Sequence, residues 1–346
     1  MTAPRSSGAL MDAEIREQPQ VWDRLLASEQ FGAIAAEIRR RAPRMVLLAA
    51  RGTSDHAALY AKYLVEIRLE LPAGLISPST MTAYGAKPDL RDVLVVAVSQ
   101  SGGSPDLVRT VEVARAQGAL TLAVTNNGAS ELAAVAELHV DVLAGPELSV
   151  AATKTYTAQQ LALYLLVDAV RGGSAAAREL PELGTALLEQ DDRVAEQAQR
   201  YRFAQRLVTT ARGYSYPTAR EAALKLMETS YLSAQAFSGA DLMHGPLAIV
   251  DSTVPVLAVV ADGPGGAAMH PVLDRVTGAG ADVFTVGTAA AVQASTGGIV
   301  LPGGVPEELS PILEILPFQQ LAMHLALARG ANPDAPRGLK KVTETL

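Results

Sequence analysis

A chain of 346 residues with a formal net charge of −7 has no lysine- and arginine-rich stripe that could neutralise a nucleic-acid backbone. The absence of cysteine excludes disulfides, a cysteine nucleophile and thiolate metal sites, and the five histidines lack a paired metal-site spacing. No uncharged apolar run approaches the ~20 residues of a membrane span, and the first residues show no apolar signal core. We therefore expect a cytoplasmic protein that needs no metal or other cofactor and binds neither nucleic acid nor membrane.

Buried strands alternate with amphipathic helices along the first half, which predicts a doubly wound parallel sheet of the α/β class. Residues 1–12 are small and polar and are expected to form a disordered tail. A helical region follows at 13–41, where Trp22 is expected to be a core or interface anchor. Strands are expected at 45–50, 74–76, 94–98, 120–125 and 139–143, with helices at 55–70, 80–84, 105–114 and 130–136.

One of these strands ends in a turn rich in hydroxyl groups. The apolar run Leu94–Val98 is followed by Ser99, Gln100, Ser101, Gly102, Gly103 and Ser104. Backbone N–H groups and the positive end of the next helix would point at one spot there, and serine hydroxyls add donors, so a phosphate monoester suits it. The alternative is a turn whose polar residues only cap the helix, and the turn taken alone favours that alternative.

The remainder of the first half leads into a second domain. Lys154 is expected near the start of a long apolar helix, where it either faces an anion or is a solvated first-turn lysine. Residues 180–201 resemble a polar linker helix. Because a single core stops growing at about 250 to 300 residues, we predict a first domain at 13–178, a linker at 179–201, a second domain at 202–330 and a tail at 331–346.

The second half repeats landmarks of the first at a constant offset. The segment Ala50–Ser54 reappears at Ala211–Ser215, and Val95–Val98 reappears as Val256–Val259, each 161 positions later. Two landmarks in one register indicate duplicated α/β domains, flavodoxin-like and flanked by helices. The hydroxyl turn is replaced in the second copy by Val260, Ala261 and Asp262. We therefore expect one phosphate site per chain, in the first half.

Three kinds of side chain in the second half suit carbon chemistry. Glu221, Lys225 and Glu228 are spaced to share one helix face, and an exposed ladder of salt bridges is the interpretation that spacing alone favours. His244 lies in a loop punctuated by glycine and proline, where a histidine has no packing purpose. The tail carries adjacent lysines, Lys340 and Lys341, and is either frayed or a flap.

Six segments together make a resemblance specific. The chain is similar to double sugar isomerase (SIS) domain proteins over nearly its whole length. It resembles the isomerase half of glucosamine-6-phosphate synthase and, more closely, the stand-alone SIS-type glucosamine-6-phosphate deaminases. The segments are RGTSDHAALYAKYL, VSQSGGSPD, VAATKTY, REAALKLME, LMHGPLAIV and GLKKVTETL.

The resemblance implies roles for individual residues. Glu228 would move a proton between C1 and C2, His244 would open the sugar ring in the neighbouring subunit's site, and Lys341 would form a Schiff base. Lys225 and Glu221 would accompany Glu228 on its helix face. The 6-phosphate would be held by Ser54, Ser99, Gln100, Ser101 and Ser104, and backbone groups of Val150 and Lys340 would meet sugar hydroxyls.

These roles predict a homodimeric enzyme with a shared active site that converts glucosamine 6-phosphate to fructose 6-phosphate and ammonia. Ring opening and a proton shift from C2 to C1 would give an imine at C2, which water hydrolyses. One alternative is an isomerase of the glucosamine-fructose-6-phosphate aminotransferase type, or a deaminase for the galacto epimer. Another is a sugar-phosphate sensor that catalyses nothing.

Overall fold

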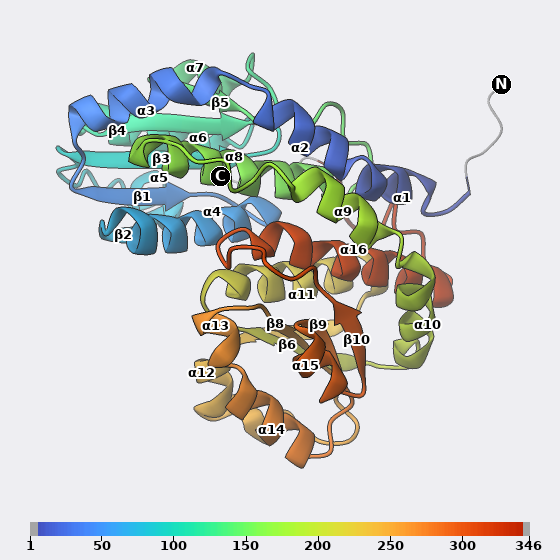
Figure 1. Ribbon diagram of the computed structural model, residues 1–346. Helices are drawn as coiled ribbons and strands as arrows, with labels where there is room; N and C mark the ends of the chain where they lie inside the picture. Colours follow the sequence, from blue (N-terminus) through green and yellow to red (C-terminus); the bar gives the residue numbers. More distant parts are fainter. Residues whose placement is uncertain (1–5, 342–346) are drawn as a thin grey trace, which may run out of the picture. The chain divides into compact units, whose positions relative to one another are not determined.

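The computed structural model describes residues 6–341, which divide into two compact units (Figure 1). The first-sheet unit consists of Gln20–Glu147 and Lys154–Arg178. The second-sheet unit consists of the described residues up to Pro19, together with Leu148–Thr153 and Glu179–Lys341. Two short pieces of the first half therefore fold with the second half.

The first-sheet unit is built on five parallel strands in the order β2-β1-β3-β4-β5. The strand β3 lies at the centre and is buried on both faces, as its uninterrupted run of valine, leucine and alanine predicts. This order is that of a flavodoxin-like doubly wound sheet, so the predicted fold class is confirmed for this half. The strands are β1 (Met45–Ala49), β2 (Ala73–Leu75), β3 (Val93–Ser99), β4 (Leu120–Thr125) and β5 (Leu138–Asp141).

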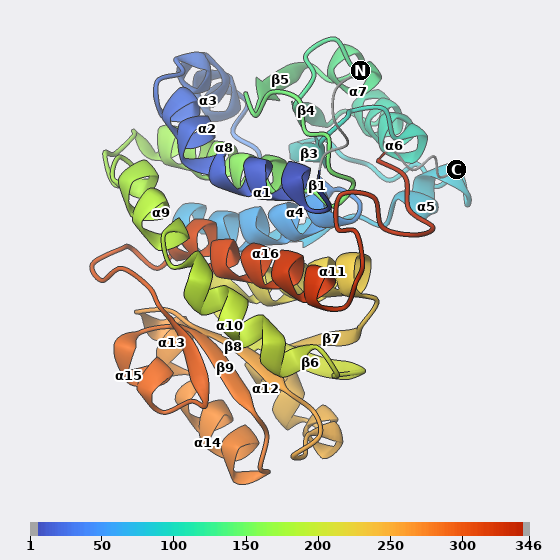
Figure 2. The same ribbon diagram turned by 90° about the vertical axis from the view of Figure 1, so that its right-hand side faces the viewer.

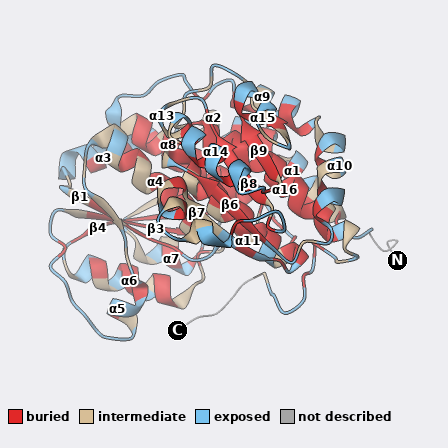
Figure 3. Ribbon diagram, turned by 90° about the horizontal axis from the view of Figure 1, so that it is seen from below, coloured by how far each residue is buried: buried red, intermediate tan, exposed pale blue. Residues whose placement is uncertain are grey.

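Helices cover both faces of this sheet. The helices α3 and α4 pack on α8 on one face, and α5, α6 and α7 pack along the other (Figure 3). Trp22 is fully buried and its indole N–H donates to Thr157 Oγ1 at 3.1 Å, which confirms it as a core anchor. The helices are α2 (Gln18–Leu26), α3 (Gln30–Arg41), α4 (Thr53–Leu64) with the π-turn η1 (Val65–Leu69), α5 (Pro78–Thr82), α6 (Pro105–Ala116), α7 (Glu131–Val135) and α8 (Lys154–Arg171).

The second-sheet unit repeats the same topology. Its sheet order is β10-β9-β8-β6-β7, which read from the other end matches the first sheet strand for strand. The predicted duplication is thus present in the strand order as well as in the sequence. The strands are β6 (Arg206–Ala211), β7 (Ser233–Ser238), β8 (Val256–Val260), β9 (Val283–Gly287) and β10 (Gly297–Val300).

Two long helices, α11 and α16, lie side by side on one face of the second sheet, and α10 packs against α16 (Figure 2). Shorter helices cover the other face. The helices are α1 (Ala9–Arg16), α9 (Leu180–Leu188), α10 (Asp191–Tyr201), η2 (Gly213–Ser215), α11 (Tyr216–Ser230), α12 (Gly239–Met243), η3 (Pro246–Ile249), α13 (Pro264–Ala267), α14 (His270–Gly278), α15 (Ala289–Gln293) and α16 (Ser310–Ala328).

Three boundary predictions need correction. Residues 9–12 are not disordered, because they begin α1 and Met11 is fully buried; residues 1–5 lie outside the described part. The helical region at 13–41 is divided among three helices, and Pro19, which cannot continue a helix, lies in the first turn of α2. The segment at 180–201 is two helices rather than a linker, and Asp191 binds the His324 imidazole of α16 at 2.8 Å.

Carboxylates of the chain itself occupy the carboxyl edge of the second sheet. Glu314 in α16 is fully buried and accepts hydrogen bonds from Ser215 Oγ at 2.7 Å and Thr218 Oγ1 at 2.9 Å. Glu307 accepts from the backbone N–H of Gly265 at 2.7 Å. Ser215 and Gly265 correspond at the constant offset to Ser54 and Ser104 of the first half. The second copy therefore fills this edge with its own acids.

Burial raises the pKa of Glu314 to about 8, and the hydrogen bonds from Ser215 and Thr218 offset only part of that effect. The folded carboxyl keeps a proton that the unfolded chain releases near pH 4.3. The contribution of this carboxyl to the free energy of unfolding is therefore fully present below about pH 4 and is lost as the pH rises toward about 8. We predict that Glu314→Gln flattens this pH dependence. The free energy of unfolding of the variant, measured by urea unfolding, should rise relative to that of the wild type as the pH increases toward 8. Parallel curves for the two proteins between about pH 5 and pH 8 would contradict the prediction.

Candidate functional site

The hydroxyl-rich turn lies at the carboxyl edge of the first sheet. β3 pairs with β1 in register from Met45 to Ala49, so the turn after Ser99 and the start of α4 at Thr53 leave the sheet at the same edge. Open α/β sheets bind ligands at this edge. The turn and Ser54 therefore meet where the sequence places a phosphate.

Two serine hydroxyls brace the turn. Ser99 Oγ accepts from Gly102 N at 3.1 Å, and Ser101 Oγ accepts from Gly103 N at 3.3 Å. Each hydroxyl uses a lone pair for the backbone, which leaves its proton free to be donated to another group. The turn requires glycine at Gly102, where φ is +65° and an added Cβ would lie 2.2 Å from Ser130 Oγ.

The other three predicted phosphate-binding residues already form hydrogen bonds within the first-sheet unit. Ser104 Oγ donates to Asp106 Oδ1 at 2.9 Å, so this hydroxyl is engaged within the turn. Ser54 Oγ accepts from the Gln159 amide at 3.0 Å. Gln100 is half-buried, and its backbone carbonyl accepts a hydrogen bond from Asn126 N. Because the N–H groups of Gly102 and Gly103 are engaged within the turn, the hydroxyl protons of Ser99 and Ser101 are its most available donors.

An arginine that the sequence analysis did not single out lies at the same edge. Arg51 lies two positions after the end of β1, and its guanidinium binds Asp106 at 2.5 Å. Asp106 is almost completely buried, whereas 46% of the Arg51 side chain is exposed. The signal was available in the repeated Arg-Gly-x-Ser motif. A guanidinium beside a hydroxyl-rich turn adds a cation for an anionic ligand.

In α11, Glu221, Lys225 and Glu228 do not form an exposed ladder, contrary to the interpretation that their spacing favours. Glu221 and Lys225 are completely buried. Lys225 Nζ lies 3.3 Å from Glu221 Oε1 and hydrogen-bonds to Glu228 Oε2. Burial by itself would lower the pKa of the Lys225 ammonium, but the carboxylates of Glu221 and Glu228 outweigh it and hold the pKa above its usual value. Lys225 is therefore a buried cation at neutral pH.

Glu228 has a different environment from its two helix partners. Its side chain keeps 22% of its surface exposed while one carboxylate oxygen is fixed by Lys225. The pair thus presents an oriented carboxylate at the surface of the unit. This arrangement is what a group that takes and returns a proton requires.

His244 is exposed at the end of α12, and its backbone N–H donates to Asp241 O at 3.0 Å. Within residues 6–341, no hydrogen bond joins its imidazole to Glu228 or Lys341. The side chain is available to a ligand or to another chain.

The tail brings Lys341, the predicted Schiff-base lysine, next to the predicted sugar-binding position Val150. Lys341 Nζ donates to Ser149 O at 2.6 Å, next to Val150. The Val150 N–H donates to Asp334 O at 3.2 Å, so its carbonyl is the group left for a sugar hydroxyl. Lys340 is exposed, and the last five residues of the GLKKVTETL motif lie outside the described part.

Lys154 is not a solvated first-turn lysine. It is the first residue of α8 and only 2% of it is exposed. The neighbouring Thr155 donates from its N–H and its hydroxyl to the Glu147 carboxylate, at 3.0 and 2.8 Å. That carboxylate lies at the positive end of the helix, where a negative charge is favourable.

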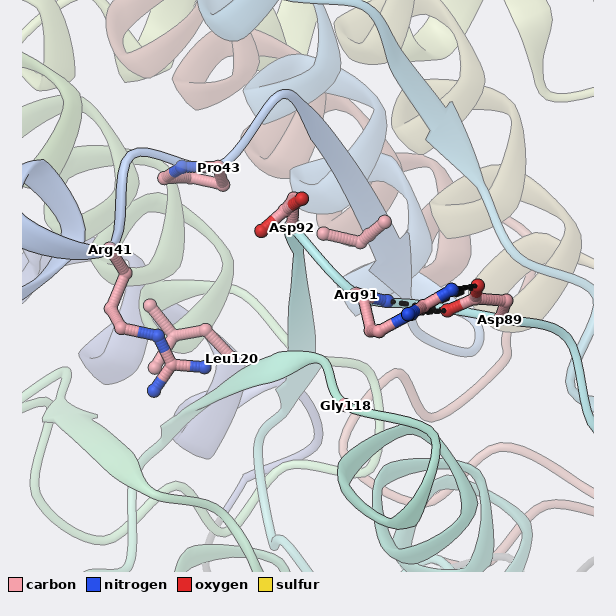
Figure 4. Close-up of a pocket in the computed structure, with 8 residues that line it drawn as sticks. Arg41, Pro43, Asp89, Arg91, Asp92, Gly118 and Leu120 are labelled. Atoms are coloured by element: carbon pink, nitrogen blue, oxygen red, sulfur yellow. Dashed lines mark hydrogen bonds and ion pairs between the residues drawn. The ribbon is translucent and has the colours of Figure 1, made fainter.

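A pocket at the opposite edge of the first sheet is a weaker candidate (Figure 4). It has a volume of about 390 Å³ and lies at the amino ends of β1, β3 and β4. The Arg91 guanidinium there binds Asp89 and holds the pKa of that carboxyl down at about 2. The pocket is lined by Arg41, Pro43, Asp89, Arg91, Asp92, Val93, Gly118 and Leu120.

No helix within residues 6–341 has the length and hydropathy of a membrane span. No group of three or more histidine, aspartate or glutamate side chains there could hold a metal ion.

The SIS domain pattern matches residues 40–169 and 201–265. The chain belongs to the SIS domain family. The first matched stretch contains the hydroxyl-rich turn, and the second contains Glu221, Lys225, Glu228 and His244. Lys340 and Lys341 lie beyond both matched stretches.

Relatives of this SIS protein include the glutamine–fructose-6-phosphate aminotransferase of Pyrococcus horikoshii, 34% identical over 95% of this chain. The chain spans 56% of that relative's length. Among solved structures, a protein assigned as a phosphosugar isomerase from Silicibacter pomeroyi is 36% identical, with a TM-score of 0.85 over 94% of this chain and 99% of that one. The C-terminal domain of the Francisella tularensis glucosamine-fructose-6-phosphate aminotransferase is 26% identical, with a TM-score of 0.86 over 94% and 98%.

We predict that Lys225→Met destabilises this SIS protein by about 3 to 5 kcal/mol, because it leaves the Glu221 carboxylate buried without its cation. Urea unfolding at neutral pH measures the loss. The control is Lys62→Met, which removes a partly exposed ion pair with Glu66 and should cost at most about 1 kcal/mol. Equal losses for the two variants would show that burial does not distinguish the pairs.

Proposed function

We propose that this SIS protein is a sugar-phosphate isomerase that moves a proton between C1 and C2 of a hexose 6-phosphate and exchanges nitrogen at C2. The substrate pair is fructose 6-phosphate and glucosamine 6-phosphate. The observation that carries the proposal is the oriented, partly exposed Glu228 carboxylate held by the buried Lys225. A site built only for binding has no need of that arrangement.

The similarities support the aminotransferase type of isomerase over the deaminase first expected from the sequence. Relatives named as aminotransferases are 34% identical across most of the chain, whereas the Thermotoga maritima glucosamine-6-phosphate deaminase is 22% identical. At that identity the deaminase supports the fold alone. We therefore place synthesis of the amino sugar first.

Deamination is the second candidate, since the same groups would catalyse the reverse reaction. The 346 residues contain no cysteine that could release ammonia from glutamine. With this chain alone, the nitrogen partner in either direction is ammonia.

The phosphate step rests on the hydroxyl-rich turn of the first-sheet unit. The hydroxyl groups of Ser99 and Ser101 would donate to the phosphate oxygens, and Arg51 would supply positive charge. Ser54, Gln100 and Ser104 complete the proposed set.

The carbon step would use Glu228 as the base. In deamination, the carboxylate would take the proton from C2 and return it to C1, while the aldehyde oxygen gains a proton and the C2 amine loses one, which gives CH₂OH at C1 and an imine at C2. Water would then add to that imine and release ammonia. In synthesis, ammonia would condense with the C2 carbonyl of fructose 6-phosphate, which releases water and forms an imine at C2, and the proton would then move from C1 to C2.

Two further groups would assist. Lys341 would hold the ketose as an imine at C2, and Val150 O with the Lys340 backbone would contact sugar hydroxyls. His244 would exchange the proton of the ring oxygen. Because its imidazole is exposed on a loop, we propose that it acts in the site of a second copy, so that the working form is a homodimer.

The test is to incubate the purified protein with glucosamine 6-phosphate and assay ammonia, and separately with fructose 6-phosphate and ammonium and assay the amino sugar. Turnover in either arm supports the proposal, and the relative rates decide between the two directions. The galacto epimer in parallel addresses substrate choice. Tight binding of both sugars with no turnover would instead establish a sensor.

We predict that Glu228→Gln abolishes turnover and leaves the affinity for the sugar phosphate close to that of the wild type, because the amide cannot accept the migrating proton. Steady-state kinetics and calorimetric binding measure the two quantities. Glu196→Gln, an exposed change in α10 of the same unit, is the control. Parallel loss of affinity and turnover in Glu228→Gln would contradict a proton-transfer role.

We predict that replacing Ser99 and Ser101 together by alanine raises KM about tenfold or more, because charge-assisted hydrogen bonds to phosphate are lost. The turnover number should change much less. Ser79→Ala, an exposed serine of α5 in the same unit, should leave KM unchanged. An unaltered KM in the double variant would remove the phosphate assignment from this turn.

A further inference from the structure

The tail that carries Lys340 and Lys341 is fastened by a side chain that points back to the start of the chain. The Asp334 carboxylate accepts from Leu10 N at 3.2 Å and from Met11 N at 2.9 Å, in the first turn of α1. The N-cap of α1 is Gly8, which has no side chain to cap these groups. Asp334 therefore acts as the cap of α1 from 324 and 323 positions away in the sequence.

The same helix fastens the segment at 148–153. Glu14, buried in α1, accepts from Leu148 N and from Ser149 N, the latter at 3.2 and 3.3 Å. The far end of the segment is held by Gln319 of α16, whose amide donates to Thr153 O at 3.2 Å. The segment is thereby fixed at both ends within the second-sheet unit.

The segment and the tail are also joined directly. Val150 N donates to Asp334 O, and Lys341 Nζ donates to Ser149 O. Between these points, Arg337 N donates to Tyr231 OH at 2.9 Å, and the Arg337 guanidinium stacks 4.1 Å above the Tyr231 ring. Tyr231 directly follows α11, the helix that carries Glu228.

We propose that Glu14 and Asp334 are positioning residues that hold Lys341 and Val150 in one place through α1. The inference rests on the proposed function for its catalytic consequence, although the clamp itself is a property of this unit. A lysine side chain is long and flexible, so its amine stays near one atom only if the backbone beneath it is fixed. The Glu14 and Asp334 carboxylates supply that fixation by accepting several backbone N–H groups.

The experiment compares Glu14→Gln and Asp334→Asn with the wild type. Each variant places an amide NH₂ where a carboxylate oxygen accepted an N–H, with almost no change in size. Asp12→Asn is the matched control, because Asp12 lies on the same helix and its side chain is 40% exposed. It forms an ion pair with Arg16 at i+4. Tyr231→Phe is a milder variant that removes only the hydroxyl accepting from Arg337 N.

The first measurement needs no substrate. Limiting acetic anhydride acylates exposed amines, and peptide mass spectrometry gives the ratio of Lys341 to Lys340 acylation in each variant. We expect Glu14→Gln and Asp334→Asn to raise this ratio several-fold, Tyr231→Phe to raise it less, and Asp12→Asn to leave it unchanged. Lys340 serves as the internal reference because it is already exposed.

The second measurement reports catalysis. The Lys341 amine condenses with the C2 carbonyl of fructose 6-phosphate, which releases water and forms an imine. Sodium borohydride then donates hydride to this imine, which leaves a stable secondary amine on the peptide. We expect the two clamp variants to lower both this yield and kcat about tenfold or more. KM for the sugar phosphate should stay within a small factor of its original value, because the phosphate turn belongs to the other unit.

The two measurements separate the hypotheses. If the wild type forms no adduct and turns over nothing, the proposed function fails while the acylation ratio still decides the clamp. If Glu14→Gln and Asp334→Asn fold, with melting temperatures near that of the wild type, and keep its acylation ratio, the clamp is refuted. Should either variant not fold, an unchanged ratio in Tyr231→Phe and in the remaining clamp variant would refute it equally.

Discussion

The site depends on one buried cation. Placing the Lys225 ammonium inside the second-sheet unit is unfavourable unless carboxylates compensate it, and Glu221 and Glu228 of the same helix do so. Because Glu221 is completely buried, its position is fixed, and Lys225 is fixed in turn. Glu228 is consequently held at one orientation while part of its side chain remains exposed. The electrostatic requirement of the core thus sets the direction of the proposed catalytic carboxylate.

The duplicated domains meet one structural need in two ways. In both copies a serine opens the first helical turn after an edge-adjacent strand, and a long later helix supplies its partner. That partner is the neutral amide of Gln159 in the first copy and the carboxyl of Glu314 in the second. The glycine-containing loops differ likewise, since Ser99 and Ser101 brace the first and Glu307 fills the second. An edge already filled by acids does not suit a phosphate, which agrees with one proposed site per chain.

The tail and the start of the chain act together for a similar reason. The first N–H groups of α1 have no partner within the helix, and Asp334 satisfies them. Glu14 from the same helix satisfies N–H groups of the segment at 148–153. Short irregular segments of this kind can keep a defined shape only when their backbone groups are bonded. Acceptors from distant parts of the sequence therefore shape the proposed sugar-binding region.

The sequence by itself determined the strands, their buried character and the duplication, because these follow from runs of apolar residues and from repeats at a constant offset. It also located the hydroxyl-rich turn at Ser99–Ser104, whose chemistry is local. It could not determine that Lys225 is buried, since the same helical spacing fits an exposed ladder and only the packing of α11 beside α16 separates the two. Nor could it show that Arg51 joins the turn through Asp106, that residues 9–12 are helical, or that Glu14 and Asp334 converge on one segment. Those features depend on contacts between residues far apart in the chain, and such contacts exist only once the tertiary structure has formed.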